Sequence, residues 1–223
     1  MKLVLNSFFL YLFFVCAPAF GEIVHKEFTI KVSGLKIGKV DWKITLSETK
    51  YLNEINLKSE GLLSKVYRFE GKYISEGIIK NNRLIASKYS HFWKTNKITK
   101  NMELVFQNDK LISLKQKPVE NEILRIDIFN VRNNNDPLTS FLQIILGETI
   151  SSVIDGRRIY KMKAVFNNKT KETVIGISNY SNLWADHKRN KFEKIIFEKR
   201  GEDYLPNKIN IYFDGRIFRL NEN

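Results

Sequence analysis

Hydrophobic and polar residues alternate along most of the chain after residue 21. The alternation is clear in Val40–Leu46, Met102–Phe106 and Ile209–Phe213. A period of two is typical of β-strands with one buried and one solvent-facing side. We count about 11–12 such strands, joined by short polar connections rather than long helices, which predicts antiparallel hairpins. The expected fold is mainly β: an antiparallel curved sheet or half-open barrel.

Two Asp-Gly pairs predict the sharpest turns. Asp214–Gly215 separates two apolar runs, and a two-residue type I′ turn there would place Ile211 opposite Phe218. Asp155–Gly156 predicts a second turn of the same type, because Asp and Gly tolerate the positive φ that this turn needs.

One segment departs from the alternation and predicts a single short helix over about residues 137–146. Asp136 suits the N-cap, Pro137 suits the first turn, and Gly147 suits the position after the last turn. The apolar face of this helix consists of Leu138, Phe141, Leu142 and Ile145. Further apolar residues surround that face, so we expect the helix to be buried inside the curved sheet, either around a ligand or as plain core.

Residues 1–21 are typical of a signal peptide. Lys2 precedes an apolar run that is short for a membrane span, and small residues end it, with cleavage expected near Ala19 or Gly21. We therefore expect a periplasmic protein, exported through a Sec-type signal, that keeps no stable membrane span after cleavage. A retained anchor and a lipoprotein acylated at Cys16 are the alternatives.

The remaining chain, residues 22–223, predicts one domain without thiol chemistry. Cys16 is the only cysteine and lies inside the segment expected to be removed. Disulfides, cysteine-bound zinc and a thiolate nucleophile are thereby excluded from the mature protein. A chain of this length can bury a sizeable core without such cross-links.

The net charge is +13, and removing Lys2 with the signal segment would leave +12. In an exported protein this charge would meet anionic lipids and other envelope polyanions, so we expect no nucleic acid partner. The proposed anion contacts are Lys97, Lys100, Lys161 and Lys163. The alternative is that an AT-rich genome simply places lysine codons on solvent-facing strand positions.

The sequence contains no catalytic motif that would indicate an enzyme, and we expect no cofactor and no metal. The phosphate-binding, nucleophile-elbow and zinc-protease signatures are absent, and the three histidines are scattered. A hydrolase would need His91 or His187 to meet a carboxylate in one pocket, so it is the least favoured hypothesis.

Two functions fit these observations. The first is non-catalytic binding of a lipid or amphiphile between sheet and helix. Its contact residues would be Leu138, Phe141, Leu142, Ile145 and Trp42. The alternative is a structural or adaptor protein that contacts another envelope protein, and the oligomeric state is left open.

Four strings resemble an exported bacterial family, domain-of-unknown-function family 3108. They are FTIKVSGLKIG (28–38), DPLTSFL (136–142), VIDGRRIY (153–160) and LPNKINI (205–211). The resemblance implies a periplasmic antiparallel curved sheet and brings no catalytic residues. In outline this fold is similar to half-barrel lipoprotein carriers that hold acyl chains beneath a helical lid, an analogy of fold alone.

Overall fold

The computed structural model describes residues 21–65, 68–184, 191–201 and 203–223. Its strands are β1 (Glu22–Val32), β2 (Leu35–Leu46), β3 (Lys50–Ser59), β4 (Phe69–Lys80), β5 (Arg83–Thr95), β6 (Thr99–Gln107), β7 (Lys110–Lys117), β8 (Ile150–Ile154), β9 (Arg158–Asn167), β10 (Glu172–Asn182), β11 (Phe192–Glu198), β12 (Lys208–Phe213) and β13 (Arg216–Glu222). A short 3-10 helix, η1 (Leu62–Lys65), precedes β4, and α1 (Pro137–Ile145) separates β7 from β8. The predicted signal segment up to residue 20, and His187, lie outside the described residues.

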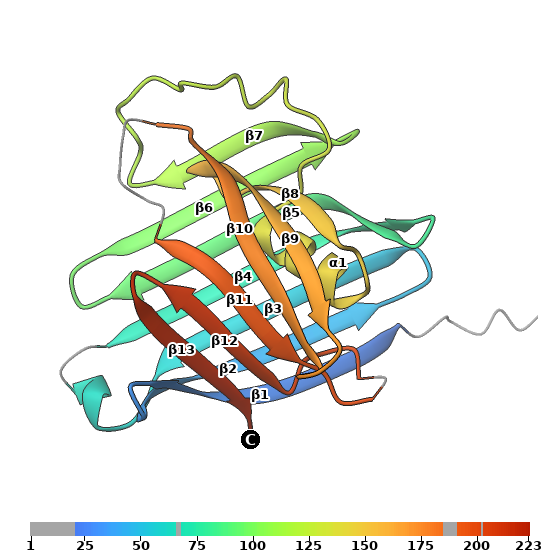
Figure 1. The fold of residues 1–223 in the computed structure, drawn as a ribbon. Helices are drawn as coiled ribbons and strands as arrows, with labels where there is room; N and C mark the ends of the chain where they lie inside the picture. The colour runs from blue at the N-terminus through green and yellow to red at the C-terminus, as the bar shows by residue number, and fades with distance from the viewer. Residues whose placement is uncertain (1–20, 66–67, 185–190, 202) are drawn as a thin grey trace, which may run out of the picture.

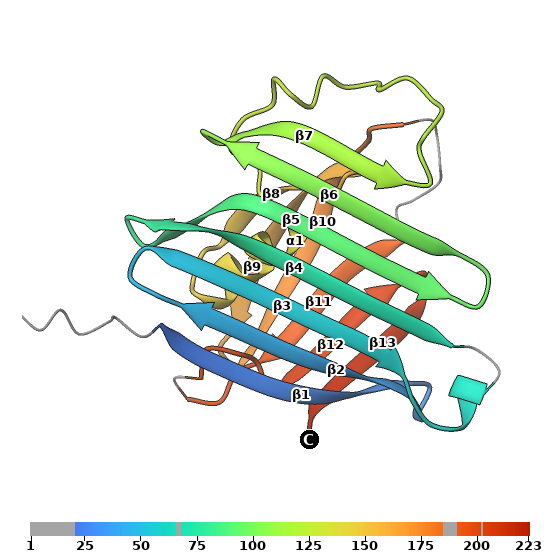
Figure 2. The same ribbon diagram turned by 180° about the vertical axis from the view of Figure 1, so that it is seen from behind.

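All 13 strands form one antiparallel sheet, which confirms the predicted fold class. Strands β2 to β7 follow β1 in order toward one edge, and β13 to β8 run in order toward the other. Pairing of β1 with β13 joins the two halves, so that β7 and β8 are the edges. Figures 1 and 2 show the halves facing one another with α1 between them. The sheet is rolled, but its edges do not pair with each other.

The alternation of hydrophobic and polar residues in the sequence matches the alternation of buried and more exposed residues along the strands. On β2, Val40, Trp42 and Ile44 are buried, while the residues between them are partly exposed. The described residues form 13 strands, slightly more than the 11–12 expected. Strand β8 has no clear alternation because two successive residues, Val153 and Ile154, are both completely buried.

One predicted turn is confirmed and the other differs. Asp214 and Gly215 both have positive φ, and Ile211 pairs with Phe218, as a type I′ turn requires. At the β8–β9 turn only Gly156 has positive φ, and the backbone of Asp155 bonds to Arg158. The central residues are therefore Gly156 and Arg157, the arrangement of a type II′ turn, and not the expected Asp155–Gly156 pair.

Helix α1 has the predicted ends. The side chain of Asp136 caps its N-terminus, Pro137 occupies the first turn, and Gly147 has a φ of +114°. Every residue from Leu138 to Ile145 is buried, and the helix contacts β4, β5, β8 and β9. No helix among the described residues has the length and apolar character needed to cross a membrane.

The two edges of the sheet overlap at β8. Neighbouring residues of a strand point to opposite faces. Val153 belongs to a core cluster that contains α1 residues such as Phe141, whereas Ile154 belongs to a second cluster with Leu104 of β6 and Leu111 of β7. Strand β8 therefore lies inside the roll, covered by α1 on one face and by the β5–β7 layer on the other.

The segment between β7 and α1 closes the gap between the edges. Arg132 forms a bridge with Lys110 of β7, and Asn135 forms a parallel bridge with Val153 of β8. Ile128, midway along the segment, is completely buried in the second cluster. A row of unpaired backbone groups on a free strand edge invites aggregation. This segment, together with the overlap, lies against part of each edge.

Candidate functional site

The side chains predicted to contact a ligand are packed against one another. The structure buries all five of them, namely Trp42, Leu138, Phe141, Leu142 and Ile145. The Trp42 ring stacks on Phe141 with their centroids 5.7 Å apart, and Phe141 meets Phe197 of β11 edge to face at 5.8 Å. Side chains of the protein itself fill the space between sheet and helix at these rings.

A buried polar network fixes the start of α1. Oδ1 of Asp136 accepts the backbone N–H groups of Leu138 at 2.9 Å and Thr139 at 3.0 Å. Oδ2 accepts the hydroxyls of Ser75 at 2.8 Å and Thr139 at 2.5 Å. The Tyr51 hydroxyl lies 2.6 Å from Oγ1 of Thr139, and burial raises the pKa of both Tyr51 and Asp136. The oxygens named here all have protein partners, so the network anchors the helix.

A hollow of about 790 Å³ lies at the β4–β7 part of the sheet. Its lining comes from both faces. His91, Met102 and Gln116 form one cross-strand row, and Asn101 and Lys117 belong to the next row, on the opposite face. The part of this hollow that is lined by residues of the inner face is called the inner recess below. The inner recess is bordered by His91, Met102, Leu114, Gln116, Leu124 and Trp184.

His91, on β5, is the titratable group of the recess. Its ring stacks on Tyr73 of β4, with the centroids 5.1 Å apart. Burial lowers the pKa of His91 to about 4, and the positive charges of Arg157 and Lys100 act in the same direction, while Asp155 opposes them. The imidazole is therefore neutral at pH 7, where it can form hydrogen bonds without carrying charge.

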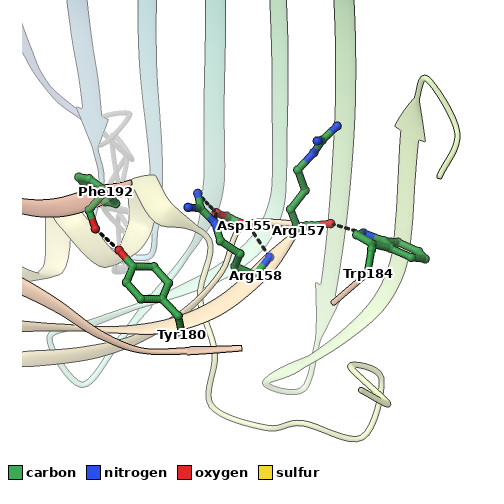
Figure 3. Close-up of polar contacts among 7 residues, drawn as sticks. Asp155, Arg157, Arg158, Tyr180, Trp184 and Phe192 are labelled. Atoms are coloured by element: carbon green, nitrogen blue, oxygen red, sulfur yellow. Dashed lines mark hydrogen bonds and ion pairs between the residues drawn. The ribbon is translucent and has the colours of Figure 1, made fainter. Parts of the chain in front are cut away.

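Arg157 does not line the hollow itself, but its positive charge acts on His91 and lowers the pKa of that side chain. It occupies the second central position of the β8–β9 turn, and its guanidinium extends away from the neighbouring ion pair of Arg158 with Asp155, which measures 2.7 Å (Figure 3). Beside it, the Trp184 indole donates to the Gly156 carbonyl at 3.2 Å. Within the part of the chain that the structure describes, the Arg157 guanidinium has neither a hydrogen bond nor an ion pair.

Gln116 also carries a polar atom in the recess that has no hydrogen-bond partner. Its Oε1 is buried and receives no hydrogen bond from the described residues. Gln116 lies opposite Met102, which in turn lies opposite His91, so the three side chains share one row. A buried polar atom without a partner costs about 1–3 kcal/mol, which a donor on a ligand or a water molecule would recover.

The four lysines predicted to contact anions do not form one cluster. Lys97 lies exposed in the β5–β6 turn. Lys100 alternates in phase with buried Met102 and therefore faces the recess side of β6. Lys161 and Lys163 are exposed on the outer face of β9, in the other half of the sheet.

Sequence reasoning missed Arg157, Gln116 and Trp184. The nearest signal is the pair Arg157–Arg158 directly after Asp155–Gly156, because successive residues there point to opposite faces and only one of them can pair with the aspartate. Nothing in the local pattern indicates that Trp184, two residues after the end of β10, meets strands β5–β7.

One cluster on the outer face of β1 and β2 has donor atoms suited to a metal ion. Atoms of His25, Glu27 and Asp41 lie within 4.8 Å of one another. Nε2 of His25 is 2.8 Å from Oδ2 of Asp41, so the imidazole and this carboxylate already satisfy each other. The arrangement is that of an exposed surface hydrogen bond.

Comparison with known proteins identifies the family of this chain. Among solved structures, the chain is similar to a β-barrel-like protein of domain of unknown function DUF1849 from Brucella abortus. The two chains are 11% identical with a TM-score of 0.49, over 92% of this chain and 96% of that chain. No curated protein matches the sequence. Residues 27–185, well over half of the chain, match the family model described as a protein of unknown function (DUF3108), and the chain therefore belongs to the DUF3108 family.

Proposed function

We propose that this protein is a non-catalytic binding protein for an amphiphile with an anionic head group, held in the inner recess between β5–β7 and the β8–β9 turn. This location differs from the one expected between sheet and helix. There the side chains around Trp42 and Phe141 already fill the space.

The unpaired guanidinium of Arg157 is the observation that carries the proposal. Removing a charge from water is costly unless an opposite charge accompanies it. Arg157 is partly buried, lowers the pKa of His91 by its charge, and has no acidic partner among the described residues. Asp155, the nearest carboxylate in the turn, bonds Arg158 instead. A carboxylate, sulfate or phosphate head group would supply the missing counter-charge.

The walls of the recess suit an apolar chain. Met102 and the Trp184 ring border it, together with Leu114 and Leu124. Ligand sites are commonly apolar hollows with a few convergent polar groups. Neutral His91 and the unsatisfied Oε1 of Gln116 are such groups, and they favour a head that also carries a hydroxyl or an amide N–H.

The proposed setting is the periplasm, entered through the segment 1–21. An N-terminal peptide beginning directly after Ala19 or Gly21, identified by mass spectrometry of the protein isolated from cells, would support this setting. An intact N-terminus would overturn it.

Binding of a fluorescent long-chain fatty acid, parinaric acid, tests the proposal. We expect saturable binding, weaker binding of its uncharged methyl ester, and about 10-fold to 100-fold weaker binding of the acid by Arg157→Gln, because a hydrogen bond to a charged group contributes about 1.5–3 kcal/mol. Arg216→Gln, an exposed arginine beside the other Asp-Gly turn, is the matched control and should bind like the wild type. Equal affinity for acid and ester, or an equal loss in both variants, would refute an anion site at Arg157.

A further inference from the structure

The outer face of strands β9–β11 carries an apolar row. Val165, Val174 and Ile196 lie directly opposite one another on the three neighbouring strands. They alternate with residues of the buried core such as Ile175, so they point outward. Val165 is 61% exposed, and Ile150 on neighbouring β8 is 50% exposed. An outer sheet face that met only water would be expected to be polar at these positions.

A basic row lies beside the apolar row. Lys163 on β9 and Lys194 on β11 flank Gly176 of β10, so their backbones are two strand spacings, or about 10 Å, apart. A Cβ at Gly176 would meet only the carbonyl oxygen of Lys163, at 4.0 Å, so open space lies above the glycine. Nζ of Lys194 lies 4.4 Å from the centre of the Tyr212 ring.

Among the described residues of β9–β11, the acidic side chains lie near the ends of the strands. Glu172 and Glu198 lie opposite each other beyond the apolar row, and Glu198 is paired with Lys208 at 2.6 Å. Lys161 and Lys163 form no ion pair with any described residue. The face therefore presents positive charge and apolar side chains together.

We propose that this face, made of the β9–β11 apolar row with Lys161, Lys163 and Lys194, docks on an anionic lipid bilayer. Figure 1 shows these strands nearest the viewer, on the side of the sheet that is away from α1. Lipid phosphates would meet Lys163 and Lys194 on the two strands that flank the open space above Gly176. Val165 and Ile150 then reach the boundary between head groups and acyl chains, which is the mode of binding of amphipathic surface elements.

Sedimentation with vesicles tests the docking face. We expect the full-length mature protein to bind vesicles of phosphatidylcholine mixed with phosphatidylglycerol, and not vesicles of phosphatidylcholine alone. Each lysine near an anionic surface contributes about a fivefold gain in partitioning, so Lys163→Gln with Lys194→Gln should weaken binding about 30-fold. High salt should weaken wild-type binding as well, because it screens these charges.

The matched control removes the same charge from the other half of the sheet. Lys39 and Lys58 lie opposite each other on β2 and β3, and their double glutamine variant should bind vesicles like the wild type. Equal loss in both double variants, or equal binding to neutral and anionic vesicles, would overturn the docking face. Arg157→Gln should leave vesicle binding unchanged, so failure of the amphiphile site and failure of the docking face are distinguishable.

Discussion

The pH dependence of stability is the sharpest test of the recess. His91 has a pKa of about 4 in the folded protein, against 6.5 for a free histidine. Between these two values the unfolded chain binds a proton that the folded chain does not. The free energy of unfolding must therefore fall as the pH decreases from about 6.5 to about 4, and this loss is absent above pH 6.5.

The size of the effect follows from the two pKa values. Each pKa unit corresponds to about 1.4 kcal/mol, so a change from 6.5 to about 4 corresponds to about 3 kcal/mol. Burial beside Tyr73 causes most of the change, and the charges of Arg157 and Lys100 reinforce it. His91→Gln removes the titrating group while keeping a polar side chain of similar size.

Urea unfolding at pH 7 and pH 4 measures this difference. The wild type should lose about 3 kcal/mol more stability over this interval than His91→Gln does. His25→Gln, at the exposed His25–Asp41 pair, should keep the wild-type loss. A variant His91→Gln that loses as much stability as the wild type would refute a buried neutral imidazole. So would an NMR titration that places the His91 pKa near 6.5.

Two further predictions concern the elements that build the site. Asp136→Ala should lower the free energy of unfolding by about 3 kcal/mol, because it removes the helix cap and leaves buried hydroxyls without an acceptor. Asp136→Asn should lose less in the same urea assay, and equal losses would contradict this account. Gly156→Ala should lose more than about 1 kcal/mol, since its φ is +79° and the new Cβ would lie 2.1 Å from Sδ of Met102. Gly34→Ala, at a similar φ of +81° but with no neighbour within 4 Å, should lose less; a loss as large would refute the contact with Met102.

Local signals in the sequence were sufficient for the fold class and for several elements. The Asp214–Gly215 turn needs only two residues that accept positive φ, and its register follows from the turn itself. The ends of α1 follow from Asp136 and Gly147, because capping is decided within one helical turn. Its burial on all sides follows from its composition, although the polar residues Thr139 and Gln143 are buried as well.

The overlap of the sheet edges could not be read from the sequence. Ile154 is buried by Leu104 and Leu111, which are at least 43 residues away along the chain, and no local pattern specifies that contact. The β8–β9 turn shows a second limit of prediction from the sequence. Its central residues are shifted by one position from the expected pair, and a shift of one residue reverses the side to which a side chain points. The role of Arg157 depends on that single position.

Strand β9 links the recess to the proposed docking face. Ile159 lies on the same face of the strand as Lys161 and Lys163, yet it packs in the core cluster beneath β5–β7 while the two lysines are exposed. One strand face thus begins under the overlapping layer, next to Arg157, and continues onto the open outer surface. If both proposals hold, the anionic bilayer lies at the same strand face that leads to the recess. A positive group then stands at each end of this strand face, Lys163 on the open surface and Arg157 under the layer. The β5–β7 layer, which overlaps the β8 edge, separates the recess from the open outer surface. Without this layer, Arg157 would lie on the surface like the other exposed cations.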